Sequence, residues 1–367
     1  MYKFNYDPYK IEDFKGVWVF CEQRQGKLMQ TDFELISEGR KLADELGVEL
    51  CGLLLGDDVK GAAKELGGYG ADKVYVCEHP LLKDYTTEAY THVMCEIVMD
   101  KKPDIILIGA SNIGRDLGPR AAARLGTGLT ADCTHLDIDV DKYIEYLREN
   151  STIDVDKTKW NRDDKGLKMT RPAFGGNLLA TIICPRFRPQ MATVRPGVMK
   201  CTEFNQAKAD ACVIESYNVE LNDSHMTTKV LETVKEAKAM VDLIGADVVV
   251  SLGFGISADP QKAVGYANEL AEVLGGVVGC SRAVVDADWL SVDHQVGQTG
   301  KTVHPRLYIA LGISGAIQHR AGMQEAECII AVNKNASAPI FEVADYGITG
   351  DLFNVMPLMI DAAKANK

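Results

Sequence analysis

The chain has 367 residues, of which 40 are basic and 52 are acidic, and its net charge is −12. At about 150 residues per domain this length predicts two domains. The acidic excess argues against a nucleic-acid partner, because proteins that bind the phosphate backbone carry a basic surface. With 46% hydrophobic and 25% charged residues, the composition is that of a soluble globular protein. No apolar run reaches the roughly 18 residues that span a bilayer, so we expect no direct membrane insertion.

Neither the N-terminus nor the cysteines point to a secreted or metal-binding protein. Residues 1–7 lack the apolar stretch of a signal peptide and the Arg-rich character of an organelle presequence, so we expect a cytoplasmic location. The ten cysteines contain no C-x-x-C pair, whereas metal and cluster sites need closely spaced thiolates. Several lie in apolar runs, where a free thiol acts as a small buried hydrophobe. Any redox chemistry is therefore expected to come from a bound cofactor in a reducing compartment.

The first part of the chain alternates short β-branched runs with helical patterns. Thr31-Asp32-Phe33-Glu34 fits a capping box at the start of a helix, and Gly47 marks its end. The other elements expected here are strands over 17–20, 48–55, 74–77 and 105–108 and a helix over 90–99. This strand-helix-strand spacing predicts right-handed βαβ units and a Rossmann-like, mostly parallel sheet.

From about residue 130 the pattern changes. Residues 136–141 alternate apolar and acidic side chains, as in a strand with one wet face, and the polar stretch 150–165 predicts a loop. Strand character returns over 178–184, 192–194 and 213–221. The turn-forming segment 222–225 marks the expected boundary and hinge, which gives an N-terminal α/β domain over residues 1–224 and a second over 225–367.

The second domain restarts the α/β rhythm. A strand over 248–250 precedes Asp259 and Pro260, a good N-cap and first helical residue, and Gly275 ends that helix. Further strands are expected over 306–311, 328–332 and 339–343. A closing helix over 351–363 should be kinked or restarted at Pro357. These elements predict a doubly wound parallel sheet.

Two glycine-rich motifs suggest phosphate chemistry at first sight. Residues 253–258 fit G-x-G-x-x-A after a strand, which is equally the pattern of a plain strand-to-helix turn, and both interpretations stay open. Residues 297–302 end in Gly-Lys-Thr, but Gln295 stands where a P-loop needs its first glycine. Nucleotide hydrolysis is therefore excluded, although the loop suits hydrogen bonding to a planar heterocycle.

The most informative stretch is residues 307–319, in which a buried strand ends in Gly-Ile-Ser-Gly and a short helix follows. Ligands of open α/β sheets bind at the carboxyl ends of strands. This position therefore predicts a cofactor site with the hydroxyl of Ser314, the amide of Gln318 and the imidazole of His319.

Residues 307–319, with Gly322 and 329–333, resemble the signature of electron-transfer flavoprotein alpha subunits. The resemblance extends to 281–283, 295–300, 339–341 and 344–347, and in the first half to 109–111, 114–117 and 195–197. It implies one FAD, held in the second domain. The residues that it implies for FAD binding are Ser281, Arg282, Gln295, Val296, Gly297, Gln298, Thr299, Ser314, Gly315, Ala316, Ile317, Gln318, His319, Asn333, Asp351 and Leu352.

The same resemblance implies individual roles. Arg282 would lie near the pyrophosphate and the flavin ring, Thr299 near the N5 edge and His319 near the C2 carbonyl. A donor or positive charge at that end of the ring favours the reduced, anionic flavin, a role open to Arg282 and His319. The family carries Gly-Arg-Gly where this chain has Gly253-Phe254-Gly255, and the loss of that cation should lower the flavin potential.

The function that the resemblance implies is electron carriage rather than turnover of a substrate by this chain alone. The chain would form a heterodimer with a beta subunit and exchange electrons with an acyl-CoA dehydrogenase or reductase, or with a quinone oxidoreductase. An electron-bifurcating complex that uses NADH is a variant of this interpretation. The rivals are a self-contained NAD-dependent oxidoreductase, suggested by the turn at Gly253, and a flavin-free scaffold. Four first-domain residues, Ser111, Arg115, Asp116 and Arg120, are expected to be structural or to contact the other subunit.

Overall fold

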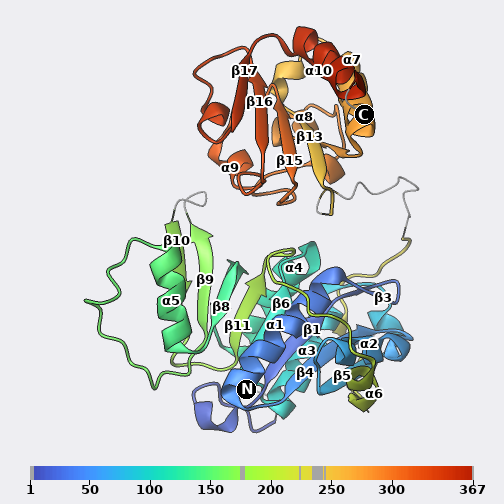
Figure 1. Ribbon diagram of the computed structural model, residues 1–367. Coiled ribbons are helices and arrows are strands. Elements are labelled where there is room, and N and C mark those ends of the chain that lie inside the picture. Colours follow the sequence, from blue (N-terminus) through green and yellow to red (C-terminus); the bar gives the residue numbers. More distant parts are fainter. Residues whose placement is uncertain (1–3, 174–177, 223–224, 234–242, 244, 366–367) are drawn as a thin grey trace. The chain divides into compact units, whose positions relative to one another are not determined.

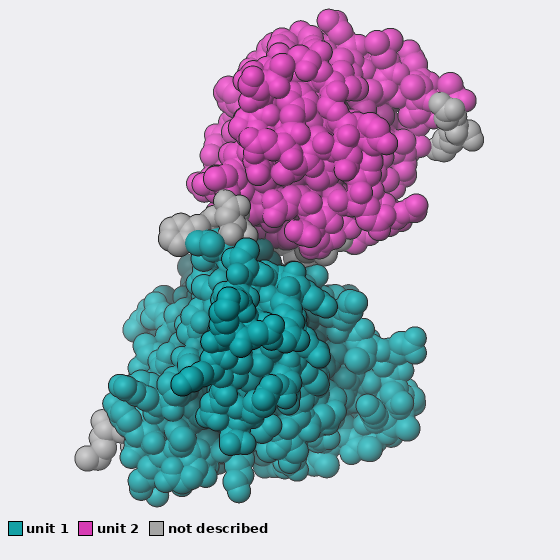
Figure 2. Space-filling model, turned by 60° about the vertical axis from the view of Figure 1, so that its left-hand side comes forward, with its two compact units in different colours: residues 1–173, 178–234 teal, residues 174–177, 235–367 magenta. Residues whose placement is uncertain are grey.

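The computed structural model describes residues 4–173, 178–222, 225–233, 243 and 245–365. The chain divides into two compact units after residue 234 (Figure 2). The boundary expected between residues 224 and 225 lies earlier in the chain, and residues 223–224 of the expected hinge lie outside the described residues. The hinge stays a prediction.

The first unit is built on a seven-stranded sheet whose strands are all parallel (Figure 1). This confirms the Rossmann-like class. In spatial order its strands are β12 (Val213–Ser216), β5 (Lys73–Glu78), β4 (Leu50–Gly56), β1 (Val17–Cys21), β6 (Ile105–Gly109), β11 (Gln190–Val194) and β7 (Leu129–Cys133). Its helices are α1 (Gln30–Leu46), α2 (Ala63–Gly68), α3 (Thr87–Lys101), α4 (Asn112–Leu125) and α6 (Gln206–Ala211), with short 3-10 turns at Ile11–Asp13, Lys60–Ala62 and Pro80–Leu82 and a small hairpin of β2 (Gln23–Arg24) and β3 (Lys27–Leu28).

Helices on both faces bury this sheet. Trp18 and Phe20 of β1 belong to one core cluster and Val17 and Val19 to the other, because successive strand side chains point to opposite faces. The expected Thr31 cap is wrong, since α1 begins at Gln30 with Met29 as its N-cap. The buried Asp32 carboxylate instead accepts hydrogen bonds from the backbone N–H groups of Met29 and Glu22, each at 2.8 Å.

An excursion between β7 and β11 carries a small antiparallel sheet of β8 (His135–Asp137), β9 (Lys168–Ala173) and β10 (Leu178–Ile182), together with α5 (Val140–Asn150). The strand expected over 136–141 is therefore wrong in its second half. Asp139 caps α5, since its Oδ1 accepts hydrogen bonds from two backbone N–H groups at 2.9 and 3.1 Å. This local capping overrides the alternating pattern.

The second unit is a five-stranded parallel sheet with a packed core on each face, which confirms the predicted class. Its strands in spatial order are β14 (Val277–Cys280), β13 (Val248–Leu252), β15 (Leu307–Leu311), β16 (Ile329–Asn333) and β17 (Tyr346–Thr349). Its helices are α7 (Pro260–Leu274), α8 (Arg282–Asp286), α9 (Ile317–Arg320) and α10 (Leu352–Ala365), with 3-10 turns at Phe254–Ile256, Val292–His294 and Pro339–Glu342.

Two expected elements of this unit are corrected. Residues 339–342 form a 3-10 turn rather than a strand, and the edge strand is β17. Helix α10 continues through Pro357 and does not restart there, while the expected kink stays a prediction. Leu352, Met356 and Ile360 of α10 are buried in the core shared with α7, and this packing outweighs the roughly 3 kcal/mol that an internal proline costs.

The remaining sequence-based expectations concern membranes, metals and thiols. No helix in the described part of the chain is long and apolar enough to cross a bilayer. Among the residues that the structure describes, no cluster of three His, Cys, Asp or Glu is placed to hold a metal ion. All ten cysteines are free, and all are buried except Cys184 and Cys328, which are half-buried, and Cys201, which is exposed.

Candidate functional site

The loops that follow β13, β14, β15 and β16 enclose a cavity of about 650 Å³ in the second unit. It lies at the carboxyl edge of the parallel sheet, where open α/β folds bind their ligands. The lining residues are Phe254, Gly255, Ser281, Arg282, Ala283, Asp286, Gln295, Val296, Gly297, Gln298, Thr299, Gly312, Ile313, Ser314, Ala316, Gln318, His319 and Asn333.

Most of the residues expected to bind a cofactor meet in this cavity. Gly315, Ile317, Asp351 and Leu352 do not line it. The lining residues that were not expected at the site are Ala283, Asp286, Gly312 and Ile313, whereas Phe254 and Gly255 belong to the turn whose phosphate-binding interpretation was left open. Each of these lies in a loop or helix that directly follows a strand, so the position at the carboxyl edge of the sheet was the available signal.

Gly315 and Ile317 lie between lining residues of the segment after β15, whereas Asp351 directly precedes α10 and Leu352 is its first residue. Asp351 accepts a hydrogen bond from a backbone N–H at the start of α10 and pairs with Lys334 at 2.9 Å. Leu352 is buried in the α10 core. Gly315 has a φ of +87°, and a β-carbon there would lie 2.1 Å from the backbone nitrogen of Ile340. These contacts give Asp351, Leu352 and Gly315 structural roles beside the cavity.

The two glycines after β13, Gly253 and Gly255, pack their backbone against Gly312, which directly follows β15, and this contact forms the floor of the cavity. A β-carbon on Gly253 would lie 2.3 Å from the carbonyl oxygen of Gly312, and one on Gly255 would lie 2.8 Å from the Gly312 Cα. The Gly255 N–H also donates to the Gly312 carbonyl at 3.0 Å. Close backbone packing therefore accounts for both glycines, as the plain-turn interpretation predicts.

Backbone hydrogen bonds fix the loop of residues 295–301 at one side of the cavity. Val296 N–H donates to the Cys280 carbonyl at 2.8 Å, and Gln298 N–H donates to the Gln318 carbonyl at 2.7 Å. Within the loop, the Gln295 amide donates to the Thr299 hydroxyl at 2.9 Å. The loop thus presents hydroxyl and amide groups from a rigid frame.

His319 is a buried, neutral imidazole. Its ring is 6% exposed, and its Nε2 lies 3.0 Å from the hydroxyl of the fully buried Tyr308. Burial lowers the pKa of His319 to about 4, although the Val296 carbonyl acts in the opposite direction. Of the two roles left open for His319, hydrogen-bond donor or positive charge, the lowered pKa leaves the donor at neutral pH. It can supply a hydrogen bond but no charge.

The buried imidazole should make the stability of the second unit depend on pH. An unfolded histidine takes up a proton below about pH 6.5, whereas His319 stays neutral until about pH 4. Below pH 6.5 the unfolded state therefore binds more protons than the folded state. The free energy of unfolding is highest above pH 6.5 and falls by about 3 kcal/mol as the pH drops toward 4.

His319→Gln should reduce this loss of stability, which denaturant titrations at several pH values measure. His304→Gln, at an exposed position, is the control. If the free energy of unfolding depended on pH equally in wild type and in His319→Gln, His319 would not be the group that causes the loss of stability.

Arg282 is the one cation in the described lining of the cavity, and Asp286 is the one carboxylate. Ser281 and Arg282 follow β14 directly, and Arg282 begins α8. The Arg282 Nε lies 3.4 Å from the Asp286 Oδ2, and both side chains are about two-thirds exposed. The positive charge expected at the site therefore comes with a counter-charge beside it.

Phe254 occupies the wall of the cavity next to these charges. It is 57% exposed and stacks on Trp289, with ring centroids 5.5 Å apart. The side chain therefore packs on a neighbouring aromatic ring.

Phe254→Arg should raise the midpoint potential of a flavin bound in this cavity, because it adds a cation to the lining. We expect at least a tenfold shift of the two-electron equilibrium toward reduction, which corresponds to about 30 mV. Spectroelectrochemical titration measures it. Phe254→Gln removes the ring without adding charge and serves as the control, and equal potentials in the two variants would place residue 254 off the flavin.

The first unit offers no comparable constellation among its predicted residues. The Ser111 hydroxyl caps α4 by accepting a hydrogen bond from the backbone N–H of Gly114, the third residue of that helix, at 3.0 Å. Arg115 forms an ion pair with Asp132 at 3.0 Å. Asp116 accepts hydrogen bonds from two hydroxyl groups at 2.5 and 2.6 Å and lies 3.8 Å from Arg120. These contacts support the structural role.

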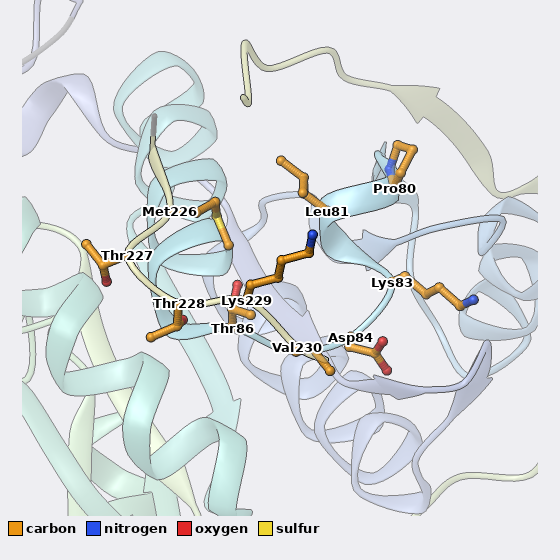
Figure 3. A pocket seen from close by; sticks show the side chains of 10 residues that line it. All are labelled: Pro80, Leu81, Lys83, Asp84, Thr86, Met226, Thr227, Thr228, Lys229 and Val230. Carbon is orange, nitrogen blue, oxygen red and sulfur yellow. The ribbon is translucent and has the colours of Figure 1, made fainter. Parts of the chain in front are cut away.

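A smaller cavity of about 380 Å³ lies in the first unit, between the loop after β5 and the segment 226–230 (Figure 3). The charged residues in its wall are Lys83, Lys229 and Asp84. Two threonines of the segment donate to the Glu88 carboxylate of α3 at 2.5 and 3.1 Å. This mixed lining selects no ligand class, and we assign it no function.

Comparison with known proteins decides between a flavin site and the alternatives. Residues 17–222 match the family model of the electron transfer flavoprotein domain, and residues 242–324 match that of the electron transfer flavoprotein FAD-binding domain. The chain belongs to the electron transfer flavoprotein alpha subunit family. Its second unit is accordingly the FAD-binding unit, and its cofactor is FAD.

Relatives match over nearly the whole length. The chain is 65% identical over 97% of its residues, and 98% of the relative, to the acryloyl-CoA reductase electron transfer subunit beta of Anaerotignum propionicum. It is 52% identical, over 97% of its residues and 100% of the relative, to an electron transfer flavoprotein subunit alpha of Thermoanaerobacterium thermosaccharolyticum. A FixB protein of Clostridium saccharobutylicum is 51% identical over 96% of this chain and 98% of its own.

The cavity suits FAD on its own chemistry. Bare glycine backbone lines it at Gly255, Gly297 and Gly312, which lets a flat group approach closely. The His319 Nδ1 is buried with no hydrogen-bond partner among the described residues, a state that folded proteins avoid. Hydroxyl and amide groups from Thr299, Gln298 and their neighbours surround this floor. Such a mix of apolar and convergent polar groups is typical of cofactor sites.

Proposed function

We propose that this chain holds FAD in the cavity at the carboxyl edge of its second sheet and passes electrons between a beta subunit and an acyl-CoA reductase or dehydrogenase. The observation that carries the location is the meeting of residues 281–282, 295–299 and 314–319 in one cavity. FAD supplies the one- and two-electron chemistry. The chain's residues bind it, orient it and set its electrostatic surroundings.

The roles of the residues follow from their chemistry. Arg282 offers charge and a planar set of donors to the anionic parts of the cofactor. Thr299, held by Gln295, and Ser314 offer hydroxyl groups. Neutral His319 is a donor or acceptor whose Nε2 is engaged by Tyr308. Asn333 donates to the Ile313 carbonyl at 2.8 Å and so braces the loop after β15, which lines the cavity.

The partner is inferred from the relatives and from the family. The relative from Anaerotignum propionicum is named as an electron transfer subunit of an acryloyl-CoA reductase, and its identity to this chain is 65%. A short-chain acyl-CoA reductase is therefore the acceptor that we propose, with a beta subunit as the second chain of the heterodimer. The rival NAD-dependent oxidoreductase rested on the turn at Gly253, whose glycines are explained by packing against Gly312.

Reconstitution with candidate partners tests this function. The chain, co-purified with its beta subunit and loaded with FAD, is reduced by NADH or by a reduced ferredoxin, and each acyl-CoA is then offered with its reductase. We expect reductase-dependent reoxidation of the flavin with acryloyl-CoA or a similar short enoyl-CoA. If the flavin were reoxidised by a quinone oxidoreductase and not by any acyl-CoA reductase, the proposed partner would be wrong. In a separate assay with NADH as the donor and oxidised ferredoxin present, reduction of ferredoxin that depends on the acyl-CoA and its reductase would identify a bifurcating complex.

A further inference from the structure

In the described lining of the FAD cavity, one positive side chain is matched by one negative side chain. Arg282 and Asp286 are the charged side chains of the lining, one of each sign, and His319 is neutral. The two charges lie on the same short helix, α8, four residues apart. A cofactor in this cavity therefore meets a carboxylate as well as a guanidinium.

Helix stability does not explain this pair. Arg282 lies at the N-terminal end of α8 and Asp286 at its C-terminal end, which is opposite to the order that the helix dipole favours. The Nε to Oδ2 distance of 3.4 Å is longer than a usual N–H···O hydrogen bond, and both side chains are about two-thirds exposed. Exposed pairs of this kind contribute about 0 to 1 kcal/mol. Within the part of the chain that the structure describes, no partner of the Arg282 terminal nitrogens is recorded, which leaves them available to another anion.

Asp286 has no other evident structural task. Among the described residues, the structure records no hydrogen bond from another side chain or a backbone N–H to its carboxylate, and Arg282 is its one ion-pair partner. A carboxylate in the wall of a cofactor cavity, whose recorded partner is an exposed arginine of the same wall, acts on the cavity mainly through its charge.

We propose that Asp286 holds down the reduction potential of the flavin by offsetting the charge of Arg282. This inference rests on the proposed location of FAD in the cavity. The isoalloxazine ring gains negative charge when it is reduced, so a nearby guanidinium favours the reduced form and a nearby carboxylate opposes it. The paired charges let the chain bind the anionic pyrophosphate through Arg282 without the full rise in potential that a lone cation would cause.

The test is Asp286→Asn in the FAD-loaded complex with the beta subunit, with the midpoint potential measured by spectroelectrochemical titration. We expect at least a tenfold shift of the two-electron equilibrium toward the reduced flavin, or about 30 mV, and tighter FAD binding. Asp286→Glu keeps the charge and should restore the wild-type potential. Glu269→Gln is the matched control, because it removes one carboxylate of a surface pair with Lys364, 2.6 Å apart, outside the cavity lining.

The outcomes separate this inference from the site on which it rests. An unchanged or lowered potential in Asp286→Asn, with a lowered potential in Arg282→Gln, overturns the role of Asp286 and leaves the FAD site in place. A potential that neither substitution moves contradicts the site itself. An equal rise in Glu269→Gln and Asp286→Asn would reduce the effect to overall charge and also overturn the inference. Far-ultraviolet circular dichroism of each variant verifies that it is folded.

Discussion

Gly315→Ala should abolish FAD binding and destabilise the second unit by about 3 kcal/mol or more. A β-carbon at this position would lie 2.1 Å from the backbone nitrogen of Ile340 and 2.6 Å from its Cα, and the residue has a φ of +87°. Both the contact and the left-handed conformation act against alanine. Because Ser314 and Ala316 line the cavity on either side, the shift that relieves the clash must move the site. Denaturant unfolding and flavin content measure the two effects.

Gly265→Ala provides the matched control for this substitution. Gly265 lies within α7, and a β-carbon there has no neighbour within 4 Å. Alanine is the better helix former by about 1 kcal/mol, so this variant should be slightly more stable than wild type and should retain its flavin. Retention of FAD at wild-type stability by Gly315→Ala would show that the loop after β15 does not shape the site.

Arg282→Gln should lower the flavin potential and weaken FAD binding, because it removes the one cation in the described cavity lining. A charged hydrogen bond to the cofactor contributes about 1.5 to 3 kcal/mol, so we expect at least a tenfold loss of FAD affinity. The two-electron equilibrium should shift by a similar factor toward the oxidised flavin, or about 30 mV. Fluorescence titration with FAD and spectroelectrochemistry measure these changes.

Two variants make the Arg282 result interpretable. Arg282→Lys keeps the charge but not the planar set of donors, so it should preserve most of the potential and lose part of the affinity. Lys364→Gln removes a positive charge from the surface pair with Glu269, outside the cavity lining, and should change neither quantity. Wild-type affinity and potential in Arg282→Gln would show that its guanidinium does not reach the cofactor.

The parallel sheets were predictable because their strands are buried on both faces and read as apolar runs. Residues 17–20 and 105–108 lie in β1 and β6 with little change of bounds. The helix ends at Gly47 and Gly275 were equally readable, since both glycines have the left-handed φ that ends a helix, at +66° and +70°. Local chemistry and global fold agree at these positions.

The wrong predictions have two physical causes, a local helix cap in one case and contacts distant in sequence in the others. Residues 136–141 alternate like a strand, yet Asp139 starts α5, because its side chain caps that helix. Pro357 lies inside α10, where burial of Met356 and Ile360 holds the helix together. Residues 339–342 form a turn that packs against Gly315 instead of entering the sheet.

The site shows a similar division. Hydroxyl, amide and imidazole groups after β15 were predictable because a strand that ends in glycines presents its next residues at the sheet edge. The neutrality of His319 was not, since it depends on burial beside Tyr308. Asp286 was missed because a carboxylate four residues after an arginine on a helix looks like an ordinary surface pair.

Photolabelling tests the central claim, that the cavity of the second unit holds FAD, most directly. The full chain with its beta subunit is loaded with an azidoflavin analogue of FAD, irradiated and digested, and the labelled peptides are identified by mass spectrometry. We predict labels within residues 281–299 and 312–319, and their loss when excess FAD competes. Labels confined to the first unit, or labels in the second unit that FAD does not displace, would contradict the account.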